Sequence, residues 1–337
     1  MPDHTSSPPQ HDSADQEPLT SRMQQAGAGP PGRRRRRLLR FPRRRRKAAR
    51  RNHETQKQVP SLLGIVRAGG AMVSPNRFRL RTFRPRVPVH VEIRNFVVKT
   101  AQNARELEKI LHLRYEVFYT EYADRRRLFW IDLDKFDLVC DHLMIIDKKS
   151  GNCIGTYRLN CSLFNDQFYS QTEFEMDAIA GLEGIKLEIG RACVHKDFRK
   201  GIILALLWRG MSEYMKATDT RYLFGCSSIK TTDPLEIAVL NAYLNGNYPA
   251  PDACRVRPRE DHELKQLPVY TRLAEHLGLE VITEHAERLI PALLSSYLRA
   301  GAWVCGDPAI DRDFHCVDFF TLLDREMLNK GLDKRYF

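Results

Sequence analysis

Long apolar segments are absent from this sequence. No apolar run approaches the roughly 18–20 residues that a helix needs to span a bilayer. The residues that follow Met1 also lack the apolar stretch of a secretion signal. We therefore expect neither a membrane-spanning helix nor a secreted protein, and we place the chain in the cytoplasm.

Paired cysteine spacings are absent as well. The chain has 8 cysteines, but they form no CxxC pair and no cysteine–histidine spacing typical of a zinc site. Scattered cysteines of this kind predict reduced thiols, as in cytosolic proteins. We expect no bound metal.

Acidic residues are scarce in the first 90 positions. This part holds 21 Lys and Arg against 5 Asp and Glu, whereas residues 91–337 hold 33 against 37. Residues 1–60 are rich in Pro, Gly, Ser, Gln and Arg and have almost no apolar periodicity, so burial cannot offset the entropy of ordering them. We predict a disordered basic leader and connector over 1–88, followed by one domain with a C-terminal extension over 89–337.

The leader carries two basic blocks, at 33–37 and 43–47. One interpretation is a solvated tail, or a translation start assigned too early with Met72 as the true start. The other is attraction to an anionic membrane surface or to an acidic protein, with the protein peripheral on the inner face of the membrane. Nucleic acid is the least favoured partner, because Phe41 is almost alone as an aromatic residue between the charges.

One stretch in the middle of the chain combines a strand, a basic turn and a helix. Residues 187–194 have the apolar character of a buried strand, and 202–209 repeat apolar residues at helical spacing. Arg199, Lys200 and Gly201 form the turn between them, and the glycine lets the backbone approach a ligand closely. Free N–H groups at a helix start attract phosphate, so this turn is a candidate anion site.

The remaining pattern alternates strands and helices, which predicts an α/β fold. Thr100 is the expected N-cap of the first helix, and Thr232 or Asp233 caps a later one. Residues 246–285 show no regular pattern, and Pro291 interrupts a late helix. The predicted strands are 89–98, 138–147, 153–159, 222–227, 303–305 and 317–323, and the other predicted helices are 100–119, 234–245 and 286–298.

Five short segments combine acidic, basic and aromatic residues. Each alone has a plain structural explanation, such as an exposed helix face, a capped turn or an ion pair. Their order is more informative than any single member. The segments are 113–118 with Arg114 and Phe118, 130–137 with Trp130, Asp134 and Asp137, 141–142, 155–159 with Arg158, and 188–191 with Glu188 and Arg191.

In this order the segments resemble the acyl-homoserine-lactone synthases. The closer resemblance is to the L-ornithine Nα-acyltransferases of bacterial ornithine-lipid synthesis, also labelled hemolysin-like. It is carried by the blocks 188–194, 207–210, 304–309 and 318–320 and covers about residues 90–337. The homoserine-lactone family is shorter and lacks the C-terminal third.

The resemblance implies a GNAT fold, a mixed twisted sheet flanked by helices. It also implies that the turn at Arg199, Lys200 and Gly201 holds the pantetheine arm of an acyl donor. Only one glycine of the usual GNAT fingerprint is present. This suits an acyl-carrier-protein thioester, which has one phosphodiester, better than coenzyme A. No further cofactor is implied, and the expected partners are acyl-carrier protein and L-ornithine.

The implied reaction is amide formation, in which an amine attacks a thioester and a thiolate leaves. The α-amine of an amino acid has a pKa of about 8, so a base must take its proton. Glu188 is the candidate base, directly or through a water, and backbone N–H groups of the strand after it can stabilise the oxyanion. Arg191 is the second catalytic candidate, or it holds Glu188 in place.

The other candidates serve substrate binding. A guanidinium at Arg158 or Arg114 suits the ornithine carboxylate, and Asp134 or Asp137 suits its side-chain ammonium. Phe118 and Trp130 complete the predicted substrate site. Cys193 is interpreted as a buried small residue rather than a nucleophile, and His142 and His195 as non-catalytic.

Three alternatives remain at this point. The acceptor can be another amino acid such as glycine or a different amine, or the chain can be a synthase of the homoserine-lactone type. Outside enzymes, it can be a lipid- or nucleic-acid-binding protein with a degenerate GNAT domain. The basic leader favours this last hypothesis, and the retained set of Glu188, Arg191 and Arg158 opposes it.

Overall fold

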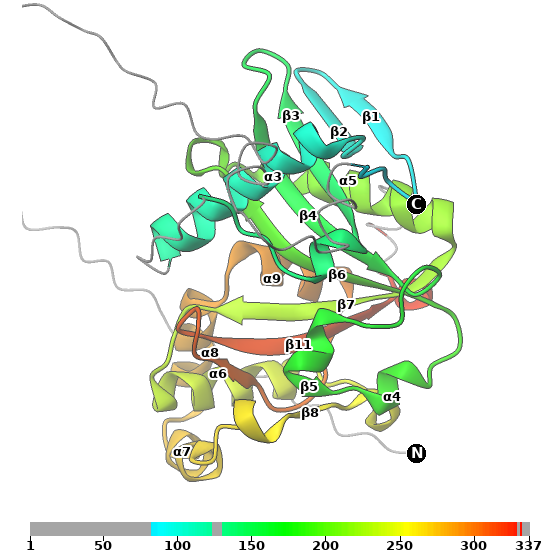
Figure 1. Ribbon diagram of the computed structural model, residues 1–337. Coiled ribbons are helices and arrows are strands. Elements are labelled where there is room, and N and C mark those ends of the chain that lie inside the picture. Colours follow the sequence, from blue (N-terminus) through cyan, green and yellow to red (C-terminus); the bar gives the residue numbers. More distant parts are fainter. Residues whose placement is uncertain (1–81, 123–129, 329–330, 332–337) are drawn as a thin grey trace, which may run out of the picture. The chain divides into compact units, whose positions relative to one another are not determined.

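A computed structural model describes residues 82–122, 130–328 and 331 (Figure 1). The basic leader up to residue 81 lies outside the described residues, as does Met72. Within the described part, a mixed sheet of nine strands has the order β1-β2-β3-β4-β6-β7-β11-β10, with β9 paired to β11. Neighbours are antiparallel except β6 and β7, which are parallel. The strands are β1 His90–Ile93, β2 Phe96–Thr100, β3 Asp141–Asp147, β4 Cys153–Cys161, β6 Ile185–Val194, β7 Thr220–Ile229, β9 Trp303–Val304, β10 Ala309–Asp311 and β11 Cys316–Asp324.

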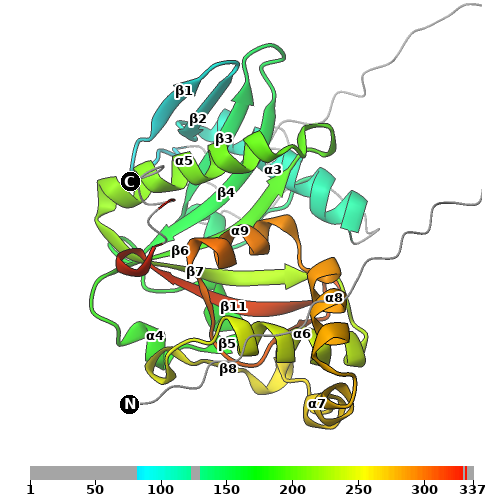
Figure 2. The ribbon, with the colours of Figure 1, turned by 180° about the vertical axis from the view of Figure 1, so that it is seen from behind.

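Helices cover both faces of this sheet. Helix α3 (Ala104–Tyr115) packs on one face together with Met144, while Leu143 and Ile145 face the opposite side under α5 (Gly201–Thr218). Successive side chains of a strand point to opposite faces, so β3 serves both layers. Figures 1 and 2 show α3 on one side of the sheet and α5 with α9 (Ala292–Ala300) on the other. The predicted mixed sheet flanked by helices is confirmed.

The C-terminal part adds a second helical group. Helices α6 (Pro234–Asn247), α7 (Leu267–Glu275) and α8 (Leu279–Leu289) bury their apolar residues against the end of β7 and β11. The prediction that 246–285 is irregular was wrong for α7 and α8. The predicted break at Pro291 separates α8 from α9, as expected. Two small elements complete this side, helix α4 (Asp177–Ala180) and a sheet of β5 (Phe174–Glu175) with β8 (Arg257–Pro258).

The start of the domain differs from the prediction. The single strand predicted over 89–98 is a hairpin, which turns at Arg94 with a positive φ of 51°. Thr100 ends β2 instead of capping the helix, because its hydroxyl bonds to the backbone N–H of Val89 and the carbonyl of Val87. Asn103 caps α3 instead and accepts from the N–H of Glu106 at 3.1 Å.

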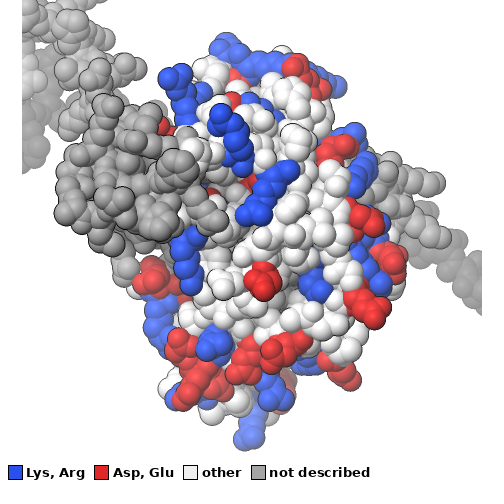
Figure 3. Space-filling model, turned by 45° about the vertical axis from the view of Figure 1, so that its right-hand side comes forward, with Lys and Arg blue, Asp and Glu red and all other residues white. Residues whose placement is uncertain are grey.

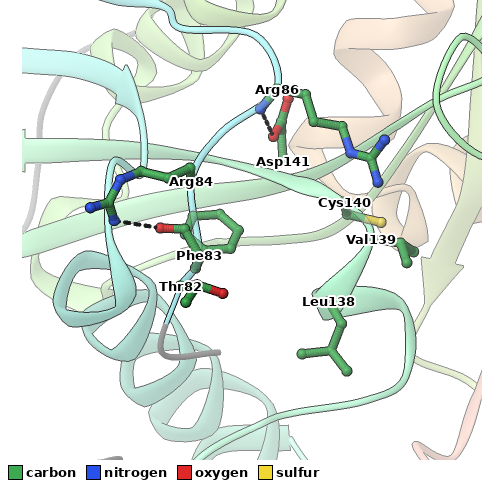
Figure 4. Close-up of a pocket in the computed structure, with 8 residues that line it drawn as sticks. All are labelled: Thr82, Phe83, Arg84, Arg86, Leu138, Val139, Cys140 and Asp141. Carbon is green, nitrogen blue, oxygen red and sulfur yellow. Dashed lines mark hydrogen bonds between the residues drawn. The ribbon is translucent and has the colours of Figure 1, made fainter. Parts of the chain in front are cut away.

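Asp141 ties the incoming chain to the sheet. Its carboxylate accepts from the N–H of Arg86 at 2.8 Å, the N–H of Val87 at 3.0 Å and the hydroxyl of Tyr214 at 2.9 Å. Burial nevertheless raises the pKa of Asp141. Figure 4 shows this contact beside a pocket of about 140 Å³. So small a pocket is a packing feature of the fold and cannot hold a fatty acyl chain.

Within residues 82–122 and 130–328, no helix is both long enough and apolar enough to pass through a bilayer.

Candidate active site

The two parallel strands at the centre of the sheet separate part of the way along. Strand β6 pairs with β7 only from Ile185 to Glu188, although both strands continue further. Gly225 stands at the point of separation, where a Cβ atom would lie 2.2 Å from the carbonyl oxygen of Ile189. Only glycine fits at so close a backbone approach. Beyond this point the gap between the strands is open to a ligand.

A cavity of about 550 Å³ lies in this gap. Its walls come from β6, β7, β11 and the start of α5, and α9 closes it with Leu293, Leu294 and Tyr297. Helix α9 is fixed to the rest of the wall by hydrogen bonds from Tyr297 to Tyr157 and from Trp208 to Ser296. The predicted site residues that line the cavity are Phe118, Arg158, Glu188, Arg191, Arg199, Lys200 and Gly201.

Glu188 presents a buried carboxylate to this cavity. It accepts three hydrogen bonds, from Ser170 N and Ser170 Oγ at 2.7 Å each and from Tyr169 N at 2.9 Å. A carboxylate has about four lone-pair directions, so about one is left for an amine or a water. Ser170 and Tyr169 were not among the predicted residues, because their loop lies 18 and 19 positions before Glu188 and follows no motif.

Three arginines and three aspartates form a compact ionic cluster next to Glu188. Arg114 lies at its closed end and is fully buried. Its guanidinium donates to Asp132 at 2.8 Å and to both oxygens of Asp137 at 2.6 and 3.2 Å. Neither Arg114 nor Asp137 lines the cavity. The structure therefore places these two predicted substrate-binding residues in the interior, where they neutralise each other.

Arg158 and Arg191 form the cavity side of the same cluster. Arg158 donates to Asp134 at 2.6 Å and to Asp137 at 3.4 Å. Arg191 donates to Asp134 at 3.2 Å, and its Nε lies 3.7 Å from Asp132. In the described part of the chain, Arg191 therefore pairs with aspartates and makes no ion pair with Glu188.

The arginines of the cluster keep the Asp134 and Asp137 carboxyls ionised. Burial works against the charge of Asp134, but Arg158 and Arg191 outweigh it and lower the pKa of that carboxyl. Burial also works against the charge of Asp137. The guanidinium groups of Arg114 and Arg158 outweigh this effect and hold the pKa of Asp137 well below its usual range. Both carboxylates are thus ionised and already have cationic partners.

Two of the three guanidinium nitrogens of Arg158 make no hydrogen bond to the described residues. Among the described residues, all of its hydrogen bonds leave from Nη1, which serves both Asp134 and Asp137. Its Nε and Nη2 donors therefore remain for a ligand in the cavity. Guanidinium donors arranged in a fork match a carboxylate.

Arg191 has an unusual backbone and an aromatic setting. Its φ of 50° lies in the left-handed region, where β6 bulges against β4. The bulge turns the side chain over the rings of Tyr169 at 5.3 Å, Phe314 at 5.4 Å and Phe118 at 6.0 Å. A strained residue held by several rings and carboxylates is a common property of functional sites.

The basic turn lies at the other end of the cavity. Gly201 is the first residue of α5, and Lys200 before it is extended and makes no side-chain cap. A Cβ at Gly201 would meet nothing within 4 Å, so a ligand has room at the helix start. Arg199 donates to the carbonyl of Val194 at 3.1 Å and keeps the turn against β6.

The remaining predicted residues lie away from this chemistry. Trp130 is half exposed, stacks on Tyr115 and does not line the cavity. Burial lowers the pKa of His142 to about 4, so this imidazole is neutral near pH 7. Burial also raises the pKa of Cys193 well above its usual range, which leaves no thiolate nucleophile there.

Comparison with known proteins identifies the family. Residues 113–209 match the model of the acetyltransferase (GNAT) domain. The L-ornithine N(alpha)-acyltransferase of Agrobacterium fabrum is 30% identical over 244 residues, which cover 67% of this chain and 79% of that protein. This chain belongs to the L-ornithine Nα-acyltransferase family. It is therefore an acyltransferase, and the predicted family, fold class and enzyme type are confirmed.

The comparisons also find a second relative and a solved structure that are similar to this chain. The family member from Rhodobacter capsulatus is 28% identical over 251 residues, or 70% of this chain and 92% of that protein. Among solved structures, the CoA-dependent acyl-homoserine lactone synthase BjaI has 16% identity, covers 68% of this chain and 81% of its own, and gives a TM-score of 0.36.

Proposed function

We propose that this acyltransferase moves a fatty acyl group, 3-hydroxylated, from an acyl-carrier-protein thioester to the α-amine of L-ornithine and so makes a lyso-ornithine lipid. One observation carries the proposal: the Glu188 carboxylate and the basic start of α5 line the same largely apolar cavity. The names of the relatives from Agrobacterium fabrum and Rhodobacter capsulatus support ornithine as the acceptor.

The acyl donor would enter along the gap between β6 and β7. Its single phosphodiester would meet the free N–H groups of the α5 start, assisted by Lys200 and Arg199. The acyl chain would then lie against Ile203, Leu207 and the apolar side of α9. Donor recognition and chain binding thus use the two ends of one cavity.

Glu188 would accept a proton from the attacking amine, directly or through one water. The new C–N bond forms as the C–S bond breaks, and the pantetheine sulfur leaves as a thiolate. Three donors from Tyr169 and Ser170 hold the Glu188 carboxylate in one orientation, so its remaining lone pair has a fixed direction. Backbone N–H groups of β6 beyond Glu188, where pairing with β7 has ended, would stabilise the oxyanion.

The carboxylate of the amino acid would bind Arg158. Its Nη1 is held by Asp134 and Asp137, which fixes the guanidinium plane and leaves Nε and Nη2 as a ready fork. Arg191, held over Tyr169 and Phe314, would close the site beside it. This arrangement orients the α-amine toward Glu188.

The basic leader would strengthen attachment to anionic membrane, where the product belongs. Residues 91–337 have a small excess of acidic residues, and Figure 3 shows acidic and basic side chains interspersed on the face shown. Each basic residue near a charged bilayer contributes about 1 kcal/mol, and salt screens this attraction. A chain starting at Met72 should therefore acylate ornithine normally but co-sediment less with anionic vesicles at low salt.

Equal vesicle binding by the full chain and the shorter one would show that the domain itself makes the membrane contact. A collapse of activity in solution on shortening would instead show that the leader docks the acidic carrier protein.

The proposed function is tested by lipid analysis and by purified components. A bacterial host that lacks ornithine lipids and expresses the chain should gain an amine-positive, phosphorus-free lipid whose fragments contain ornithine. With purified enzyme, acyl-carrier-protein thioesters should be better donors than the matching coenzyme A thioesters. A lipid with a glycine head group, or a homoserine lactone, would contradict the proposal and support one of the alternatives.

A further inference from the structure

A second group of carboxyls lies on the cavity, on the strands opposite the ionic cluster. Asp318 on β11 and Asp311 at the end of β10 both line the cavity, and both side chains are buried. Glu173, from the loop before β5, is buried beside Asp318. The sequence pattern carries no signal for this group, because Asp318 belongs to a family block with no assigned role and Glu173 to no motif at all.

This acidic group has no cationic partner. In the described part of the chain, no Lys, Arg or His lies within ion-pair distance of Asp318, Glu173 or Asp311. Asp318 Oδ1 and Glu173 Oε2 accept from no other group, and the two carboxyls face each other, so that a proton held by one of them is the bond between them without a ligand. Asp318 is only 2% exposed. A buried polar oxygen without a partner is costly, so its presence on a cavity wall points to a ligand that supplies the donor.

The group is also connected to Glu188. Ser170, which donates twice to Glu188, in turn accepts from Cys226 Sγ at 3.5 Å. Cys226 also interacts with Glu173, and burial together with the nearby charges of Glu173 and Asp318 raises the pKa of this thiol well above its usual range. A polar path therefore leads from Glu188 to Asp318 along one wall of the cavity.

We propose that Asp318, together with Glu173, binds the side-chain ammonium of the amino-acid acceptor and selects for diamino acids. The inference rests on the proposed function. Asp134 and Asp137 do not provide this site, because Arg158, Arg191 and Arg114 already neutralise them. An ammonium brings three N–H donors and one positive charge, which matches carboxyl oxygens that have no cation in ion-pair contact.

A metal ion fits the same place less well. The potential ligand atoms of Asp311, Cys316 and Asp318 lie within 4.8 Å of one another. However, Asp311 Oδ1 already accepts from the N–H groups of Asp313 and Phe314 at 2.8 and 3.0 Å. Burial raises the pKa of the Cys316 thiol, which disfavours the thiolate that a metal requires.

The test compares two acceptors that differ only in the ammonium. L-norvaline has the carbon skeleton of L-ornithine without the side-chain amine. With the full chain and a long-chain acyl-carrier-protein thioester, kcat/KM is measured for both acceptors in wild type and in Asp318→Asn. We expect the substitution to lower kcat/KM for ornithine about 10- to 100-fold, as for a lost hydrogen bond to a charged group. The value for norvaline should change less than about threefold, within what loss of a neutral contact costs.

Asp324→Asn is the matched control. Asp324 lies on the same strand but pairs with Arg221 at 3.2 Å and does not line the cavity, so the ratio of the two kcat/KM values should stay at the wild-type value. Glu173→Gln should shift the ratio in the same direction as Asp318→Asn. Thermal unfolding of each variant shows that the fold is kept.

An equal loss for ornithine and norvaline in Asp318→Asn would overturn the inference. If EDTA abolished the activity and a divalent cation restored it, the inference would be wrong and a metal site would be supported. If wild type acylates neither acceptor, the proposed function fails, and calorimetric binding of ornithine still decides the inference. Weaker ornithine binding by Asp318→Asn than by wild type would support it, and equal binding would overturn it.

Discussion

Two sets of carboxylates, one behind the cavity wall and one on it, differ in their partners. Asp132, Asp134 and Asp137 have three arginines within 2.6 to 3.7 Å. Glu188 and Asp318 have no cation at such a distance among the described residues, and only neutral donors approach Glu188. Arginines neutralise the first set, whereas no cation among the described residues pairs with the second.

The contrast separates structural charge from charge that meets a substrate. A buried ion pair costs desolvation, but breaking it costs more, so the paired aspartates hold Arg114, Arg158 and Arg191 in place. The unpaired carboxylates keep capacity for groups that arrive with the substrate, an amine proton at Glu188 and an ammonium at Asp318. The predictions that follow test this division, beginning with the largest effect.

Replacing Glu188 by Gln should lower turnover about 10²- to 10⁴-fold, the usual cost of losing a general base. The volume hardly changes, so the fold should persist with only the loss of hydrogen bonds from Tyr169 or Ser170. The measurement is kcat with ornithine, together with circular dichroism. Exposed Glu183→Gln is the control and should behave as wild type. Activity within a few-fold of wild type would remove Glu188 from the base role.

Replacing Asp137 by Leu should lower the free energy of unfolding. Arg114 and Arg158 would keep buried charges with one partner fewer, and breaking a buried pair costs about 3–5 kcal/mol. Urea unfolding gives the free energy directly. As a contrast, Lys148→Ala removes an exposed pair with Glu92, and its effect on the free energy of unfolding should be far smaller than that of Asp137→Leu. A well-folded Asp137→Leu protein would show that the ionic cluster is not the scaffold of the site.

Replacing Arg158 by Lys should raise the KM for ornithine about 10-fold and leave the KM for the acyl donor almost unchanged. Lysine keeps the charge near Asp134 but loses the fork that fits a carboxylate. Steady-state kinetics with each substrate varied in turn separates the two constants. A change confined to the donor KM would assign Arg158 to the acyl or pantetheine site.

The smallest effect concerns pH. Burial and the neighbouring Glu173 raise the pKa of Asp318 well above its usual range, so the folded protein binds a proton there that the unfolded chain has already released. Stability contributed by this group is therefore present at low pH. It falls as pH rises from the pKa of the unfolded chain to that of the folded protein, by about 1.4 kcal/mol for each pH unit between the two. Asp318→Asn should be as stable as wild type near pH 4 and more stable at pH 8, as measured by thermal unfolding. The opposite trend would show that Asp318 is ionised and stabilised in the empty protein.

Much of the fold followed from local patterns in the sequence. Apolar alternation and caps such as Asp233, which accepts from Leu235 N and Glu236 N, set most strands and helices within a few residues. The hairpin at Arg94 was missed because its turn contains no glycine or proline, and helices α7 and α8 because their exposed faces interrupt the apolar pattern.

The sequence indicated most members of the ionic cluster but not how they pair. The sequence marks Arg114, Arg158, Asp134 and Asp137 as a group, yet which side chain neutralises which depends on distances between residues 18 to 57 positions apart. Ser170 and Tyr169 carried no signal, because a loop residue that bonds a carboxylate through its backbone needs no particular motif.

The position of α9 has a consequence for the host membrane. This helix lies outside the matched GNAT segment 113–209, yet Leu293, Leu294 and Tyr297 form one wall of the cavity. If the acyl chain lies against that wall, the side chains of α9 determine which chain lengths fit in the cavity. Substitutions in α9 would then change the acyl-chain length of the product, and with it the melting temperature of a bilayer that contains this product. Glu188 would stay unchanged.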